Sequence, residues 1–159
     1  FLIEHENPSE RPDKGLQKVF KSVFPLEDFS GSARIEYIEY DFQSSPQLLF
    51  QYLSSPSGLS EWFSDDVNYR GEKYTFFWGE SEEYARVITK KQNEKIRFQW
   101  ITGEEDEEKY FFEFKIQMDE ITKGVSLIIT DFSTDDEIDE SKLLWDSLIS
   151  DLKQVLGST

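Results

Sequence analysis

Between residues 73 and 132, apolar and polar side chains alternate in a series of short segments, and this pattern constrains the fold most strongly. Period-two alternation is typical of β-strands that bury one face and leave the other in water. A strand-rich region is predicted from Val67 onward, and a separate strand is predicted over 34–42. Within that region, the individual strands are predicted over 73–78, 84–90, 96–100, 110–118 and 125–132.

Helices are predicted around these strands. Residues 46–53 and 56–63 each carry an apolar stripe at helical spacing, and each begins with a proline, which the first turn of a helix tolerates. A longer helix is predicted to follow the acidic residues 135–137 and to end at Gly157. The order of strand, two helices, about five strands and a long helix predicts an α+β fold in two layers, with an antiparallel sheet on the last helix. The stripe of the last helix consists of Trp145, Leu148, Ile149, Leu152, Val155 and Leu156.

Composition excludes several classes of function. The 159 residues include 33 acidic and 17 basic side chains, a net charge of −16, which repels nucleic-acid phosphates and anionic membranes. The chain has no cysteine and a single histidine, His5, so disulfides, Cys-ligated metals and a Ser–His–Asp triad in the core are excluded. No apolar run approaches the ~20 residues of a membrane helix, and no segment resembles a signal peptide. We expect a cytoplasmic protein without membrane insertion.

Aromatic residues make up 16% of the chain, which is far from the composition of a disordered acidic protein. Two interpretations remain open: the rings fill a core at ordinary interior density, or the sheet curves away from the last helix and the rings line an apolar ligand pocket. Tyr40, Tyr52 and Arg97 are polar-tipped residues that could orient a ligand head group, although Arg97 is expected on the outer face. The predicted lining of the pocket is Tyr52, Trp62, Phe76, Trp78, Phe98, Trp100, Phe112, Phe114, Trp145 and Ile149.

Carboxylates are abundant, but none forms a catalytic or metal-binding pattern. Asp65-Asp66 is expected at a helix end or turn, and Glu113 is expected to face solvent, opposite its neighbouring rings. The run 104–108 lacks the spaced ligands of a calcium loop and is expected to be a solvated hairpin loop. No nucleophile elbow or phosphate loop occurs, so we expect no catalytic residues, no metal and no cofactor. The acidic residues of 104–108 and 135–140 could together form a docking face for a basic protein.

Residues 34–159 resemble the START-like, helix-grip superfamily. The resemblance rests on Ser44-Ser45-Pro46 and on the segments 55–63 and 74–78, and near the end on 129–132 and 144–146 together with Leu152-Lys153. It implies a curved antiparallel sheet around a C-terminal helix, with two short helices after the first strand, and a possible cavity between sheet and helix. It implies no known reaction.

The first part of the chain resembles a different protein. Residues 15–25, which include an expected short helix over 15–24, and Asp28-Phe29-Ser30-Gly31 are similar to the N-terminal region of the bacterial RNA polymerase β subunit. Everything catalytic in that subunit is missing, so no polymerase activity is implied. The simplest interpretation is a fusion near residues 31–34, and a native extension is the alternative. Residues 1–33 are therefore expected to be partly disordered and dispensable for folding of the START-like domain.

These observations predict a non-catalytic START-like domain that binds a small hydrophobic molecule, such as a lipid, between the sheet and the last helix. The alternative is a protein–protein interaction module that uses its acidic surface, as co-chaperone relatives of the superfamily do. A START-like enzyme would need a polar cluster inside the pocket, and the sequence shows none clearly.

Overall fold

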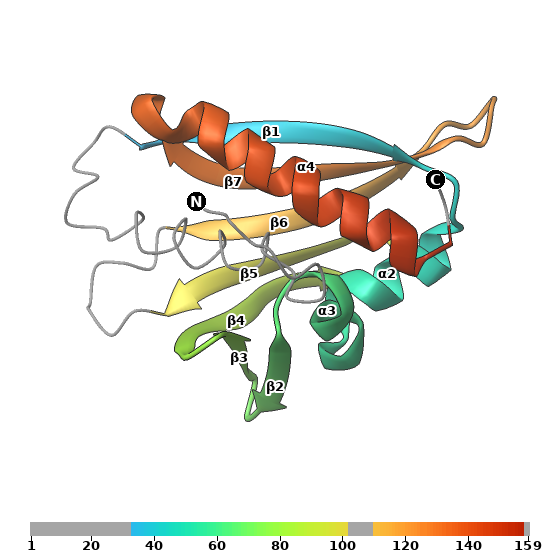
Figure 1. Ribbon diagram of the computed structural model, residues 1–159. Helices are drawn as coiled ribbons and strands as arrows, with labels where there is room; N and C mark the ends of the chain where they lie inside the picture. Colours follow the sequence, from blue (N-terminus) through green and yellow to red (C-terminus); the bar gives the residue numbers. More distant parts are fainter. Residues whose placement is uncertain (1–32, 102–109, 158–159) are drawn as a thin grey trace.

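The computed structural model describes residues 33–101 and 110–157, and the predicted 15–24 helix and 104–108 loop lie outside these ranges. Within them, a curved antiparallel sheet carries two short helices and one long helix (Figure 1). This arrangement confirms the predicted α+β helix-grip fold. The elements are β1 (Ala33–Phe42), α2 (Pro46–Ser54), α3 (Pro56–Trp62), β2 (Asp66–Arg70), β3 (Lys73–Trp78), β4 (Ser81–Lys91), β5 (Lys95–Ile101), β6 (Phe111–Met118), β7 (Val125–Thr134), η3 (Asp135–Glu137) and α4 (Ile138–Val155).

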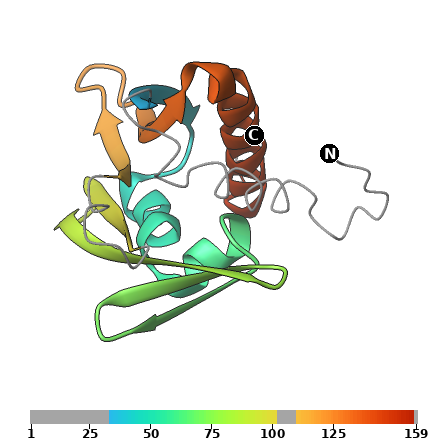
Figure 2. The same cartoon turned by 90° about the vertical axis from the view of Figure 1, so that its left-hand side faces the viewer.

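The sheet has the strand order β1-β7-β6-β5-β4-β3-β2, so β1 and β2 are its edges among the described residues. β1 pairs with β7 without interruption from Ala33↔Thr134 to Phe42↔Val125. A bulge between Val87 and Thr89 interrupts the pairing of β4 with β5. Bulges increase the local twist of a sheet, and the strands curve around the helices (Figure 2).

Helices α2 and α3 begin in the same way, with a serine cap followed by a proline. The Ser45 Oγ accepts a hydrogen bond from the Leu48 amide at 3.1 Å, and the Ser55 Oγ accepts one from the Gly58 amide at 2.9 Å. These caps satisfy amides that have no partner inside the helix. The repeated Ser-Pro signal in the sequence therefore places both helix starts correctly.

Strand β2 is the one strand whose sequence gives little signal. Four of its five residues are exposed, and only Val67 is buried, so it shows no alternation. Just before it, the Asp65 carboxylate accepts a hydrogen bond from the Gly79 amide at 2.7 Å, and the Asp66 carboxylate accepts one from its neighbour Val67. The Asp65-Asp66 pair thus serves the turn into the sheet, in line with its expected structural role.

Candidate functional site

The predicted pocket residues come together in one cluster between the sheet and the helices. Tyr52 is half-buried and the other nine are buried. Neighbouring rings lie in contact: the ring centroids of Phe98 and Phe112 are 4.8 Å apart, and those of Trp100 and Phe112 are 4.9 Å apart. Such offset and tilted contacts add stability beyond the area they bury.

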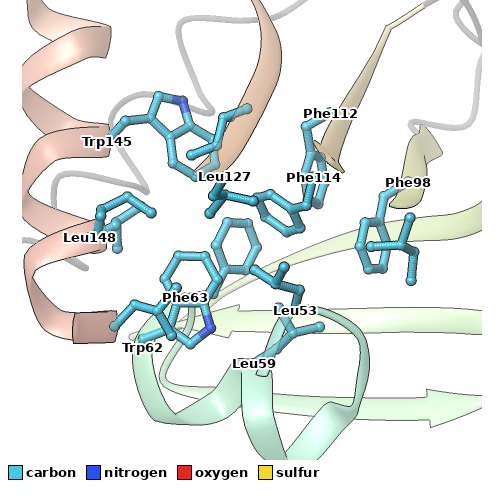
Figure 3. Close-up of a cluster of buried hydrophobic side chains, with 14 of the residues drawn as sticks. Leu53, Leu59, Trp62, Phe63, Phe98, Phe112, Phe114, Leu127, Trp145 and Leu148 are labelled. Atoms are coloured by element: carbon cyan, nitrogen blue, oxygen red, sulfur yellow. The ribbon is translucent and has the colours of Figure 1, made fainter. Parts of the chain in front are cut away.

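Phe63 lies at the centre of this cluster, although it was not among the predicted lining residues. It is the residue that caps α3, and it points between the sheet and α4 (Figure 3). Its ring stacks on Phe112 at 5.3 Å and on Trp145 at 6.1 Å, and meets Phe76 edge-on at 5.1 Å. One side chain from α3 thus bridges the sheet and the last helix.

The polar atoms of the buried aromatic residues reach backbone acceptors. Trp62 Nε1 donates to the Tyr52 carbonyl at 2.8 Å, and Trp78 Nε1 donates to the Phe63 carbonyl at 3.0 Å. The Tyr74 hydroxyl donates to the Ser54 carbonyl, and burial raises the pKa of Tyr74 to about 12. These bonds fix the rings against α2 and α3, because a buried donor without an acceptor is costly.

A buried polar cluster lies beside the rings at the end of the sheet where α4 begins. Glu36 and Asp131 are 8% and 4% exposed, and they are directly opposite each other on β1 and β7. The Ser141 hydroxyl donates to the Glu36 carboxylate at 2.5 Å. Asp131 accepts a hydrogen bond from Trp145 Nε1 at 3.0 Å. Two carboxylates of the inner face are thereby joined to α4.

Burial shifts the acid–base properties of this cluster. It raises the pKa of Glu36, while the hydrogen bond from Ser141 and the charge of Lys142 act in the opposite direction. Farther along β1, the Tyr40 hydroxyl donates to the Asp146 carboxylate at 2.6 Å, and burial followed by that contact raises the pKa of Tyr40. Tyr40 therefore holds α4 rather than presenting its hydroxyl to the interior.

The sequence analysis missed the buried polar cluster, although a signal was present. Glu36 is an even number of residues from Ile38, Tyr40 and Phe42, so it lies on the same face of its strand. Asp131 is likewise two residues from the buried Ile129 and lies on the same face of β7. Both carboxylates were therefore at inward-facing positions, where the sequence analysis identified no clear polar cluster.

Glu113 corrects one expectation of the sequence analysis. It points to the outer face, as predicted, but it is only 6% exposed rather than solvent-facing. Arg97 also lies on the outer face, where its Nε donates to the Glu113 carboxylate at 2.8 Å and its guanidinium lies 4.0 Å from the Phe111 ring centre. The arginine covers the carboxylate, so Arg97 is not placed to bind a ligand inside the fold.

Negative charge gathers where η3 leads into α4. We define the acidic surface as Asp135, Asp136, Glu137, Asp139, Glu140 and Asp146 together with Ile138 and Leu143. Leu143 is 68% exposed, and Lys142 is the one basic residue within 135–146. Burial, followed by the hydrogen bond and charge of Glu140, raises the pKa of Glu137. Carboxylates on this surface are therefore crowded together.

The outer face of the sheet is hollowed beside β1. A hollow of about 410 Å³ lies among side chains of β1, β7 and β6, which include Tyr37, Ile128 and Lys115. A second hollow of about 430 Å³ continues from Glu39 toward Met118 and Asp119. Both lie on the face opposite α4.

Residues 33–101 and 110–157 hold no group of three or more His, Cys, Asp and Glu side chains that could bind a metal ion. None of the helices in that part of the chain is long and apolar enough to cross a membrane.

The family model of the START-like superfamily domain matches residues 31–158. The chain belongs to this superfamily. Its fold is similar to that of BfR322 from Bacteroides fragilis, with 34% identity over 79% of this chain and 92% of that chain and a TM-score of 0.56. The Aha1 dimer from Colwellia psychrerythraea shares the fold at 17% identity, over 77% of this START-like chain and 96% of that chain, with a TM-score of 0.65.

A separate similarity involves the polymerase. The RNA polymerase subunit beta of Chelativorans sp. (strain BNC1) is 52% identical over 44 residues, or 28% of this chain. That of Sinorhizobium fredii is 54% identical over 43 residues, or 27% of this chain. The START-like chain spans about 3% of the length of these relatives, so the match is to a fragment, as the N-terminal resemblance predicted.

Proposed function

We propose that this START-like domain is a non-catalytic protein-binding module, and that its acidic surface takes a basic segment of a partner protein. The observation that carries the proposal is the exposed Leu143 set among crowded carboxylates at the start of α4. An apolar contact surrounded mainly by charges of one sign combines affinity with selectivity for a partner of opposite charge.

The packing of the interior supports a role for the surface. Phe63 stacks on rings from both the sheet and α4, in the space where a hydrophobic ligand was expected. Close-packed interiors resist the insertion of further atoms, because neighbouring side chains would leave their preferred rotamers. A ligand at this position would have to displace Phe63 or its partners.

Electrostatics support a basic partner. The pKa of Glu137 is raised in part by Glu140 and Asp136, so these carboxylates repel one another in the unbound domain. A cationic segment would relieve this repulsion on binding. The net charge of −16 would also accelerate the approach of such a partner at low ionic strength.

The test is a peptide titration with two charge-matched variants. The probe is an amphipathic peptide in which lysines surround a leucine, and binding is followed by calorimetry. The double variant Asp139→Lys/Glu140→Lys should weaken binding about tenfold or more, since two attractive contacts become repulsive. The control Glu80→Lys/Glu120→Lys makes the same charge change at exposed positions elsewhere. Equal weakening by both variants would overturn the proposal, because it would indicate attraction to the overall charge alone.

A hydrophobic ligand remains the second candidate, favoured by the buried polar cluster beside the rings. Glu36 and Asp131 could orient the polar end of a mostly apolar molecule if the neighbouring rings moved apart. Native mass spectrometry of freshly purified protein tests this directly. An adduct of a few hundred daltons that is lost on denaturation would support an interior ligand, and a bare mass would favour the surface proposal.

A further inference from the structure

Strand β1 is an edge of the sheet. Its neighbour on one side is β7, and no strand within residues 33–101 and 110–157 pairs with its other side (Figure 1). α4 covers the inner face of β1 through side-chain contacts, such as those of Ser141 and Asp146, and makes no β-ladder with it. The backbone amides and carbonyls along that side of β1 are thus arranged for a further strand.

The form of β1 is suited to pairing. It is ten residues long and contains no proline, and its register with β7 runs without a bulge. Proteins commonly protect an edge by shortening it or by interrupting it with a bulge or proline. The other edge, β2, has only five residues. β1 is therefore the edge that offers an extended template.

The outward side chains of β1 form an ordered pattern. Ile35 and Tyr37 come first and are 45% and 70% exposed, and Glu39 and Asp41 follow on the same face. No ion pair within the described part of the chain involves Glu39 or Asp41.

We infer that β1 binds an extended segment of a protein partner as an additional antiparallel strand. Every neighbouring pair of strands in this sheet is antiparallel, and an added strand in that direction meets β1 from Asp41 back to Ile35. On the outer face, every second residue of the added strand lies beside one of these side chains. From its N-terminus, the first two such residues are lysine or arginine, beside Asp41 and Glu39. The next two are apolar, beside Tyr37 and Ile35. Backbone hydrogen bonds supply affinity in this mode, and the alternate side chains supply specificity.

Charge decides between a partner and a second copy of this chain. Two β1 strands paired with each other would bring together two chains of net charge −16 and would set carboxylates of one beside apolar side chains of the other. A basic segment instead pairs with Glu39 and Asp41. This surface lies on β1, apart from the acidic surface at the start of α4, so the inference stands whether or not the acidic surface binds a partner.

The experiment uses a ten-residue peptide with lysines at two alternate positions followed by valines at the next two alternate positions. The full chain is titrated with it while backbone amide exchange is measured. We expect slower exchange for amides of β1. N-methylation of alternate peptide amides along one edge should abolish binding, whereas N-methylation along the other edge should leave the Kd unchanged, because one edge alone faces β1. The control peptide has the same residues in reverse order and should bind about tenfold more weakly.

The double variant Glu39→Lys/Asp41→Lys should weaken binding of the lysine peptide about tenfold and improve binding of the matched glutamate peptide. Its control, Glu61→Lys/Glu80→Lys, carries the same charge change at exposed positions on α3 and between β3 and β4, away from β1, and should bind the lysine peptide within about threefold of the parent. The inference is overturned if millimolar peptide protects no amide of β1. It is also overturned if both methylated peptides bind like the parent. A dimer in sedimentation whose β1 amides already exchange slowly without peptide would overturn it as well.

Discussion

The Trp145 indole donates a hydrogen bond to the Asp131 carboxylate at 3.0 Å, and this bond joins the middle of α4 to β7. The same ring stacks on Phe63 at 6.1 Å. Trp145 therefore combines a polar contact with the sheet and an apolar contact with α3. Side chains from the sheet, α3 and α4 therefore meet at Trp145.

Replacing Trp145 with alanine should destabilise the domain by about 3–5 kcal/mol, because it removes a buried ring and leaves Asp131 without this donor. Chemical denaturation measures the change. Leu143→Ala on the exposed side of the same helix is the control and should change stability by less than about 0.5 kcal/mol. A Trp145→Ala cost below about 1 kcal/mol would contradict the packed interior and indicate that Trp145 lines an open space.

Glu36→Gln should alter how stability depends on pH. The pKa of Glu36 is raised by burial above its ordinary value of 4.5, so the folded state holds this proton more tightly than the unfolded state does. The stabilising contribution is thus complete below pH 4.5 and is lost as the pH rises through the folded-state pKa. Glutamine cannot ionise, so the stability of the variant relative to the parent should increase with pH over that interval.

Thermal denaturation from acid to neutral pH measures this difference. Glu39→Gln removes one charge from an exposed position of the same strand and controls for the general relief of repulsion. A Glu36→Gln curve that runs parallel to the parent across the whole range would show that burial of this carboxylate does not influence stability.

Gly58→Ala should destabilise the domain. A Cβ at this position would lie 2.5 Å from the Gln51 carbonyl oxygen and 2.7 Å from the Tyr52 Cα, and both are backbone atoms. Overpacking of this kind costs about 1–3 kcal/mol, which exceeds the gain of up to about 1 kcal/mol that alanine brings to a helix. Ser57→Ala at the exposed neighbouring position is the control. A higher Tm for Gly58→Ala would mean that α2 and α3 separate readily.

Salt should raise the Tm of the domain. From about 0.1 M to 1 M sodium chloride, the Debye length falls from about 10 Å to about 3 Å, so repulsion among surface carboxylates is screened. A gain of about 1 kcal/mol corresponds to roughly 4 °C in a domain of this size. Asp139→Lys/Glu140→Lys should reduce the response. A Tm that falls with salt would instead indicate that ion pairs such as Arg34–Asp135 dominate.

Local patterns predicted most of the fold because each depends on neighbours in the sequence. Alternation assigned the rings of β3 and β5 to one face, and the Ser-Pro pairs placed the starts of α2 and α3. The acidic residues before α4 and the left-handed Gly157 after it also agree with the predicted helix. These features were available without knowledge of the register.

The rest depended on contacts between distant segments. Alternation places Glu36 on the inward side of its strand, but only the pairing of Glu36 with Asp131 and the approach of Ser141 reveal the polar cluster. In the same way, Glu113 is buried because Arg97 lies over it. Helical spacing placed Phe63 on the apolar side of the predicted 56–63 helix, but its central position depends on how α3 packs against the sheet.

Side-chain contacts join β1 to η3 and α4 at three points along the molecule. Arg34 meets Asp135, Glu36 meets Ser141 and Tyr40 meets Asp146, in the same order along both elements. The six residue steps from Arg34 to Tyr40 span about 20 Å of strand, and the eleven steps from Asp135 to Asp146 span about 17 Å of helix. The two distances are similar, so the contacts stay aligned along both segments. Insertion of a single residue early in α4 would rotate every later contact by about 100°. The length of this helix is consequently under tighter constraint than the identity of most of its residues.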